Sequence, residues 1–301
     1  MIYGDDRAVV LASADGQVQR RIPVPVDIGA IAYSPASGRL VIQGKGDWGG
    51  KLYLVDQKTG HARELLSRPV YFKNLTRKDK DVSKSERERI NQEEHEVYAD
   101  PEFDPIGSLL VFAVHDAGPG EWDAVDAAGP LAILDLRTSA VHVLNATLLK
   151  EQQGPFYSNN PHWSPDGSRI VLSFEAGAAI VDPKGLRLTA LDGWFEQTSD
   201  DESSAVCWLD NRSLVYGVYG NSGSGKPDSF AVLDLETRHS RPAAEVLGVA
   251  PAVLDGASDM EATASLILIR REDGVRLYER RTGRLLSFLP IGDKAAVLAG
   301  P

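Results

Sequence analysis

A short phrase returns along this chain, and it constrains the fold more than any other feature of the sequence. Its clearest copy, at 163–172, reads Trp-Ser-Pro-Asp-Gly-Ser-Arg-Ile-Val-Leu, and variants occur at 33–42, 103–112 and 208–216. In the clearer copies an aromatic residue closes a strand, proline and glycine favour a tight turn, and an aliphatic strand follows. The phrase therefore predicts a β-hairpin that is repeated along the chain.

A second phrase follows the first, an apolar strand that ends in an acidic residue before a Thr-Gly-like turn. The acidic residues that mark it are Asp15, Asp56, Asp135, Asp182, Asp234 and Glu279. They are 41 to 52 residues apart, except for one spacing of 79 that contains a charged insertion at about 69–100. Four-stranded propeller blades recur at about 40–50 residues, whereas helical solenoids need a 3.6-residue periodicity that this chain lacks. The sequence predicts an all-β fold, a β-propeller.

The two phrases together divide the chain into blades. Five complete blades are predicted at about 25–68, 95–147, 155–192, 203–246 and 248–290. The N-terminal piece, 1–24, and a short C-terminal strand, 294–298, would form a sixth blade, so that both termini close the ring and no sheet edge stays open. We expect a single domain over 1–301 with six four-stranded blades, with five or seven as the alternatives.

The Trp-Ser-Pro-Asp-Gly-Ser phrase, followed by a Leu-Val-Asp-like strand, resembles the WD40-like (PD40) repeat of the TolB-type β-propellers. The resemblance covers nearly the whole chain at the level of the repeat, and it implies the fold far more than any function. TolB-type proteins carry a further α/β domain, and related peptidases carry a Gly-x-Ser-x-Gly hydrolase domain. Neither is found in this sequence, so we expect a stand-alone propeller.

The tight turns should lie on one face of the ring and the longer connections on the other. Long loops on a rigid scaffold are where binding residues gather, and exposed tryptophans often anchor interfaces. The candidate binding residues of this loop face are Trp48, His115, Glu121, Trp122, Asp123, Tyr157, Trp194, Asp200 and Asp201. Packing of each tryptophan over a blade rim is the alternative.

The charged insertion should contain one helix. Ser85 to Glu88 form a capping box, and Ile90 and Val97 fall on one stripe of the helix. A solvated, ion-paired helix and a lid that contacts a partner both fit this pattern.

Two alternatives for chemistry follow from the histidines and the cysteine. Some TolB-like propellers are pectin-fragment lyases that hold a metal with channel histidines, and this resemblance implies His95, His115 and His162 as ligands of a divalent metal, Ca²⁺ or Mn²⁺. A histidine before Trp-Ser-Pro-Asp-Gly also occurs in copies without a catalytic role, and then no cofactor is needed. Cys207, the single cysteine, lies in an apolar strand, where a buried and inert thiol is expected.

The net charge of −11 and the pI near 5.1 argue against a nucleic-acid partner and favour, if anything, a basic one. No apolar run is long enough for membrane insertion. The chain as written carries no signal peptide, which indicates the cytoplasm, or the periplasm if a signal peptide has been removed.

These observations leave two functions open. The first is a non-catalytic, monomeric binding module, a scaffold or an inhibitor or immunity-type partner, that holds a protein or peptide at its loop face and channel. The second is a metal-dependent propeller enzyme, a lyase or hydrolase that acts on a sugar or lactone at the channel mouth.

Overall fold

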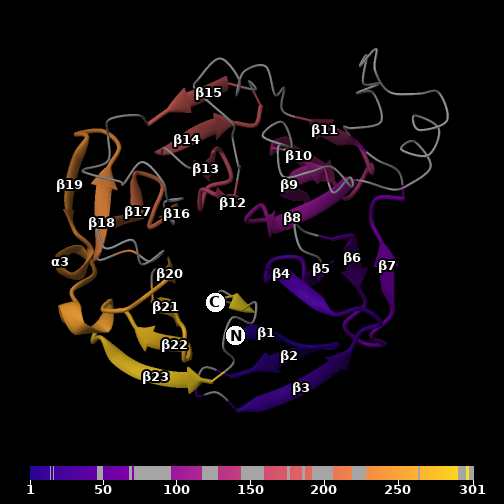
Figure 1. Cartoon of the computed structure of the whole chain (residues 1–301), viewed down its shortest axis with the longest axis horizontal. Coiled ribbons are helices and arrows are strands. Elements are labelled where there is room, and N and C mark those ends of the chain that lie inside the picture. Colours follow the sequence, from indigo (N-terminus) through magenta and orange to yellow (C-terminus); the bar gives the residue numbers. More distant parts are fainter. Residues whose placement is uncertain are drawn as a thin grey trace, which may run out of the picture.

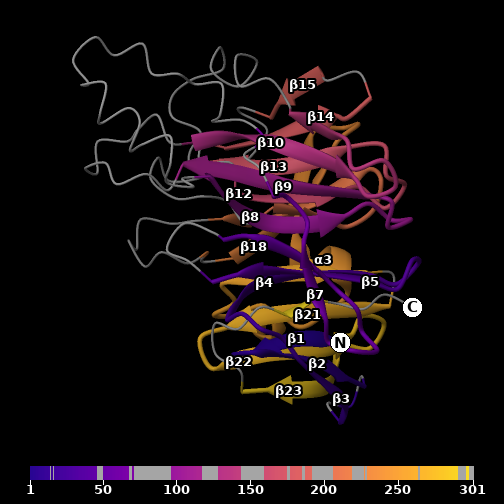
Figure 2. The same ribbon diagram turned by 90° about the vertical axis from the view of Figure 1, so that its right-hand side faces the viewer.

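Six four-stranded antiparallel sheets stand as blades around a common centre (Figure 1). The computed structural model describes residues 1–13, 15, 17–45, 50–67, 70, 96–116, 128–143, 159–174, 177–184, 187–191, 206–218, 227, 229–263, 265–290 and 296–297. In side view the inner strands run roughly along the short axis of the ring, from one face towards the other (Figure 2).

In five blades the first strand along the chain lies nearest the centre, and in blade 1 that place belongs to β24, the last strand of the chain. Blade 1 combines β24 (Ala296–Val297), β1 (Ile2–Asp5), β2 (Ala8–Ala12) and β3 (Val18–Pro23), and blade 2 contains β4 (Ile28–Ser34), β5 (Arg39–Gly44), β6 (Leu52–Val55) and β7 (Ala62–Glu64). Blade 3 contains β8 (Glu96–Phe103), β9 (Leu109–Asp116), β10 (Ala128–Asp135) and β11 (Val141–Val143).

The second half of the ring follows the same order. Blade 4 contains β12 (Asn159–Trp163), β13 (Ile170–Phe174), β14 (Gly177–Asp182) and β15 (Arg187–Ala190), and blade 5 contains β16 (Val206–Trp208), β17 (Ser213–Val218), β18 (Ser229–Asp234) and β19 (His239–Pro242). Helix α3 (Ala243–Leu247) and the 3₁₀ turn η2 (Pro251–Val253) lead to blade 6, which contains β20 (Asp259–Ala262), β21 (Leu266–Arg271), β22 (Gly274–Glu279) and β23 (Arg284–Leu289). No described helix is long and apolar enough to cross a membrane.

The six-bladed propeller predicted from the two phrases is confirmed, and so is its closure. Strand β24 pairs with β1 through Val297 opposite Ile2 and Ala296 opposite Tyr3, so the two ends of the chain share one sheet. Such pairing closes the ring by joining the N-terminal and C-terminal segments in one blade.

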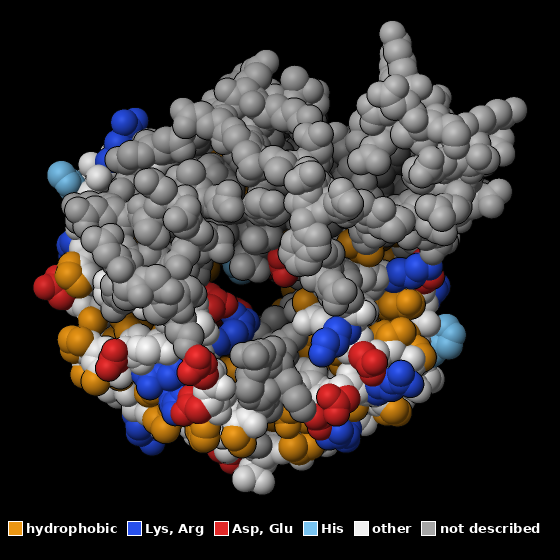
Figure 3. All heavy atoms as spheres, in the orientation of Figure 1, with side chains coloured by type: hydrophobic (Ala, Val, Ile, Leu, Met, Phe, Trp, Pro, Cys, Tyr) orange, Lys and Arg blue, Asp and Glu red, His pale blue; other side chains and the backbone are white. Residues whose placement is uncertain are grey.

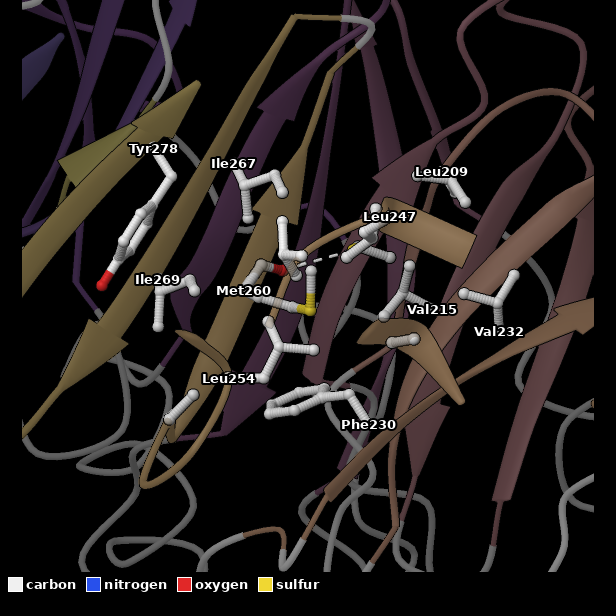
Figure 4. Packing of buried hydrophobic residues seen from close by; sticks show 14 residues of the cluster. Leu209, Val215, Phe230, Val232, Leu247, Leu254, Met260, Ile267, Ile269 and Tyr278 are labelled. Atoms are coloured by element: carbon white, nitrogen blue, oxygen red, sulfur yellow. Dashed lines mark hydrogen bonds between the residues drawn. The ribbon is translucent and has the colours of Figure 1, made fainter. Parts of the chain in front are cut away.

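Apolar residues from neighbouring blades form the core between the sheets. Between blades 5 and 6, Met260 is 1% exposed and lies among Phe230, Leu254 and Ile269 (Figure 4). The seam between blades 6 and 1 is closed by a separate cluster that includes Val10 and Val275. Each sheet is thus buried on both faces, which accounts for the runs of valine, leucine and isoleucine in the inner strands.

The tight turns of the first phrase hold neighbouring blades together. Gly38, Gly107 and Gly167 have φ of 64°, 70° and 69°, values that glycine adopts at little cost. Arg39 Nη1 donates to Gly107 O at 2.7 Å, and Asp166 N donates to Asn211 Oδ1 at 2.9 Å. The phrase therefore forms contacts from blade to blade as well as hairpins.

The charged insertion is shorter than expected. Residues 96–100 belong to β8, and Tyr98 exchanges backbone hydrogen bonds of 2.9 and 3.0 Å with Gly50 of blade 2. Val97, which we placed on a helical stripe, lies in this strand opposite His115, so that part of the helix prediction is wrong. The remainder of 69–100, apart from Val70, lies outside the described residues.

Candidate functional site

The centre of the ring is hollow, and acidic, basic and histidine side chains border the opening (Figure 3). Among the described residues, the innermost strands β8, β12 and β20 supply Glu102, His162, Asp259 and Glu261, and β21 supplies Arg270. We call these five residues the channel cluster. They come from blades 3, 4 and 6, so the packing of blades around the centre brings the two halves of the cluster together.

Glu102 and His162 form the first half of the channel cluster. His162 Nδ1 lies 2.5 Å from Glu102 Oε2, and the other carboxylate oxygen accepts a hydrogen bond from Trp163 N at 2.9 Å. The side chains of His162 and Glu102 are 27% and 32% exposed. Each residue directly precedes the aromatic residue of its phrase, so the two occupy equivalent positions in neighbouring blades.

The charges around His162 keep its imidazole protonated. Burial lowers the pKa of His162, but the charge and hydrogen bond of Glu102, with the charges of Glu261 and Asp259, outweigh burial and raise the pKa to about 9. At neutral pH the pair is therefore an imidazolium and a carboxylate. Within the described residues, Nε2 of His162 has no hydrogen-bond partner.

Arg270 forms the second half of the channel cluster with two acidic residues of β20. Its Nη1 pairs with Asp259, and its Nη2 lies 2.5 Å from Glu261 Oε1. Burial lowers the pKa of Arg270, but the charges of Asp259 and Glu261 outweigh it, so the guanidinium stays charged. With three carboxylates and two cations, the channel cluster is acidic by one charge.

The strand next to His162 fixes its position and supplies no nucleophile. Trp208 Nε1 donates to His162 O at 2.8 Å, which ties β16 to β12. The Cys207 thiol is 7% exposed and donates to Met260 O at 3.3 Å. Burial, and then the charges of Asp259 and Glu261, raise the pKa of this thiol, so the thiolate is disfavoured. The expectation of a buried thiol is confirmed.

The structure describes the side chain of one sequence-predicted site residue, His162, which lies on β12, the innermost strand of blade 4. His115 is placed in β9 by its backbone alone. The other candidates lie outside the described residues: His95, Trp48, Glu121, Trp122, Asp123, Tyr157, Trp194, Asp200 and Asp201. The sequence analysis did not identify the other four residues of the channel cluster. An alignment of the repeated phrases would have shown that Glu102 and His162 occupy equivalent positions in neighbouring blades.

The residues around His162 meet only part of what a divalent metal site requires. A carboxylate on Nδ1 is the usual support of a metal-binding histidine and would leave Nε2 as the ligand atom. Yet ligation requires a neutral imidazole, and Glu102 favours the protonated form. Within the described part of the chain, no three His, Cys, Asp or Glu side chains are grouped to hold a metal ion.

The fold is shared with several solved propellers. The structure is similar to TolB from Acinetobacter baumannii at 13% identity and a TM-score of 0.58, covering 98% of this chain and 64% of TolB. It is similar to oligogalacturonate lyase in complex with manganese at 15% identity and a TM-score of 0.57, covering 92% of this chain and 69% of the lyase. It is also similar to a chain of the nidogen/laminin complex at 8% identity and a TM-score of 0.56, covering 98% of this chain and 95% of that chain.

At these identities the likeness concerns the fold, and the chain spans less than two thirds of the length of TolB. No protein-family model and no curated sequence matches the chain. The TolB-like propeller fold that the phrases predicted is thus confirmed.

Proposed function

We propose that this protein is a non-catalytic binding module that holds a protein or peptide at one face of the ring and at the channel mouth. The asymmetry of the connections carries this proposal. Between the described strands, all connections longer than six residues join the second strand of a blade, counted from the centre, to its third, or one blade to the next. These ends share one face, while the opposite face has only turns of six residues or fewer. Long connections on a rigid ring are typical of binding surfaces.

The charge distribution favours a basic partner. The channel cluster is acidic by one charge, and the whole chain carries −11. Complementary charge raises association rates and selects partners more than it adds affinity. Among solved structures, the same fold occurs in a nidogen/laminin complex, which is consistent with a role in binding.

The contact residues that we propose are the candidates from the sequence, with Trp122 and Trp48 as anchors. Affinity capture with the purified protein as bait should enrich one partner, and Trp122→Ala should reduce its recovery at least tenfold. Ile106→Ala is the matched control, because Ile106 is 69% exposed in a turn on the opposite face. Equal recovery with Trp122→Ala and the unsubstituted protein would contradict the proposal.

The Glu102–His162 pair supports one alternative, a metal-dependent lyase or hydrolase. In that case His162 would hold the metal through Nε2 with His95 and His115, and Glu102 would orient the ring. The metal would polarise a substrate oxygen. One of the similar folds is an oligogalacturonate lyase in complex with manganese. Metal analysis of the purified protein decides between the two functions, because a stoichiometric metal that His162→Gln abolishes favours the enzyme.

A further inference from the structure

The outer strands of blades 1 and 6 differ from those of the other blades. Strands β7, β11, β15 and β19 have three or four residues, whereas β3 and β23 have six. Of the four exposed large apolar residues among those described, three lie on these two strands: Val18, Leu285 and Phe288. Outer strands are usually kept short or charged, because a free edge invites pairing with another chain. Blade 6 departs from that rule.

A bulge in β23 places its two exposed apolar side chains on one side. Leu285 pairs with Tyr278 and Phe288 pairs with Arg276, because Leu286 is an extra residue between them. Tyr278 and Arg276 are two residues apart and share a face of the sheet, so Leu285 and Phe288 share it too. The Arg276 guanidinium lies 4.6 Å from the Phe288 ring centroid and is held by Asp273 at 2.6 and 2.5 Å.

The other side of β23 is basic. Arg284 is 70% exposed and lies opposite Glu279, its only ion-pair partner among the described residues, at 3.8 Å. On β3, Arg21 and Val18 lie opposite Val10 and Ala12, which pack against blade 6, so both side chains face this side. Arg21 is 58% exposed and pairs with Asp5 at 2.6 Å. Residues 271–290 contain five arginines and three acidic residues, in a chain of net charge −11.

We propose that the free edge of β23 binds an extended segment of a partner protein in which apolar and acidic side chains alternate. In the described structure β23 pairs with β22 alone, so a further strand could add to its outer edge. Successive side chains of an added strand point to opposite faces. The apolar set would cover Leu285 and Phe288, and the acidic set would reach Arg284 and Arg21. Main-chain hydrogen bonds between β23 and the added strand would supply affinity, and the alternating side chains of the added strand would supply specificity.

This site lies on the outer rim, away from the channel, and does not depend on the proposed function. The probe is an acetylated octapeptide in which glutamate and valine alternate, and the reference is a peptide with four glutamates followed by four valines. We expect the alternating peptide to bind with a Kd at least tenfold lower, and to slow amide hydrogen exchange within 284–289. Leu285→Ser together with Phe288→Ser should weaken binding tenfold or more at an unchanged melting temperature.

Ile106→Ser is the matched control, because it removes a more exposed apolar side chain from the turn face, the face of the ring that carries only short turns between the described strands. It should leave binding unchanged. Arg284→Glu should weaken binding of the alternating glutamate–valine peptide. Binding of an alternating lysine–valine peptide should be unchanged or stronger. The proposal is overturned if both glutamate peptides bind equally or not at all. It is also overturned if the edge is occupied in dimers of this chain, or if the Leu285 and Phe288 substitutions abolish only binding to vesicles of anionic lipid.

Discussion

On the turn face, Asp56, Asp135 and Asp234 each accept hydrogen bonds from backbone N–H groups two and three residues further along the chain. In the channel, Glu102 and Glu261 pair instead with cationic side chains of other strands. The first arrangement is complete within one turn. In the second, the Glu261–Arg270 pair joins two strands of blade 6, and the Glu102–His162 pair exists only when blades 3 and 4 are assembled.

This difference sets how each region responds to a substitution. Removing a turn aspartate leaves a few exposed N–H groups that water can satisfy. Removing a cation from the channel leaves carboxylates that are only about one-quarter to one-third exposed and close to other carboxylates. Unpaired charges in such surroundings cost far more than unpaired surface charges.

The largest effect should follow from Arg270→Met. Loss of the guanidinium leaves Asp259 and Glu261 without their partner, and we expect the free energy of unfolding to fall by about 3 kcal/mol in urea titrations. Arg212→Met is the matched control on the turn face, because Arg212 is 55% exposed and pairs with Asp234 and Glu236 at 2.9 Å. It should cost less than about 1 kcal/mol. Equal losses would remove the distinction between the two regions.

The pH dependence of His162 should be the next largest effect. Its folded pKa, about 9, lies above the ordinary value of 6.5, so its contribution is complete below pH 6.5 and is lost as the pH rises through 9. We expect unfolding titrations to show a loss of about 2 kcal/mol across this window, after allowance for partial exposure. In His162→Gln that slope should be absent. A wild-type slope that persists in the variant would assign it to another group.

On the turn face, Asp104→Ala should have an intermediate effect. The Asp104 carboxylate is 7% exposed and accepts hydrogen bonds from Ser108 N at 2.6 Å and Leu109 N at 2.7 Å. Their loss should cost about 1–2 kcal/mol in the same titrations. Asp104→Asn keeps one carbonyl acceptor and should recover part of the loss. A cost as large as that of Arg270→Met would show that local turns are as critical as the channel.

The turn face was predictable from sequence and the channel cluster largely was not, for one physical reason. Turn chemistry is local, so proline, aspartate and glycine within five residues specify the hairpin at Gly107 or Gly167 without knowledge of the ring. Glu102 and Glu261 are more than 150 residues apart, and only blade packing brings them together. The second phrase also forms its turn without glycine at Ser139 and Arg238, which adopt φ of 58° and 59° where related turns have glycine.

The smallest effect is expected at Asp166 on the turn face, where stability should depend on pH with the opposite sign to that at His162. Hydrogen bonds from the Ser168 backbone and from the Ser164 and Ser168 hydroxyls lower the pKa of Asp166 from 3.8 to about 2. A lowered pKa contributes stability above pH 3.8 that is lost as the pH falls towards 2.

Because Asp166 is exposed, solvent screening limits this term to well below about 1 kcal/mol. Asp166→Asn should therefore slightly reduce the loss of unfolding free energy at acid pH (the acid limb) and leave its pH dependence between 6.5 and 9 (the alkaline limb) unchanged. His162→Gln should remove the dependence between pH 6.5 and 9 and leave the acid limb unchanged. Acid and alkaline unfolding series on both variants measure the two limbs separately. If either substitution altered both limbs, the turn and the channel would be electrostatically coupled through the sheets, and the local reading of the turn aspartates would be wrong.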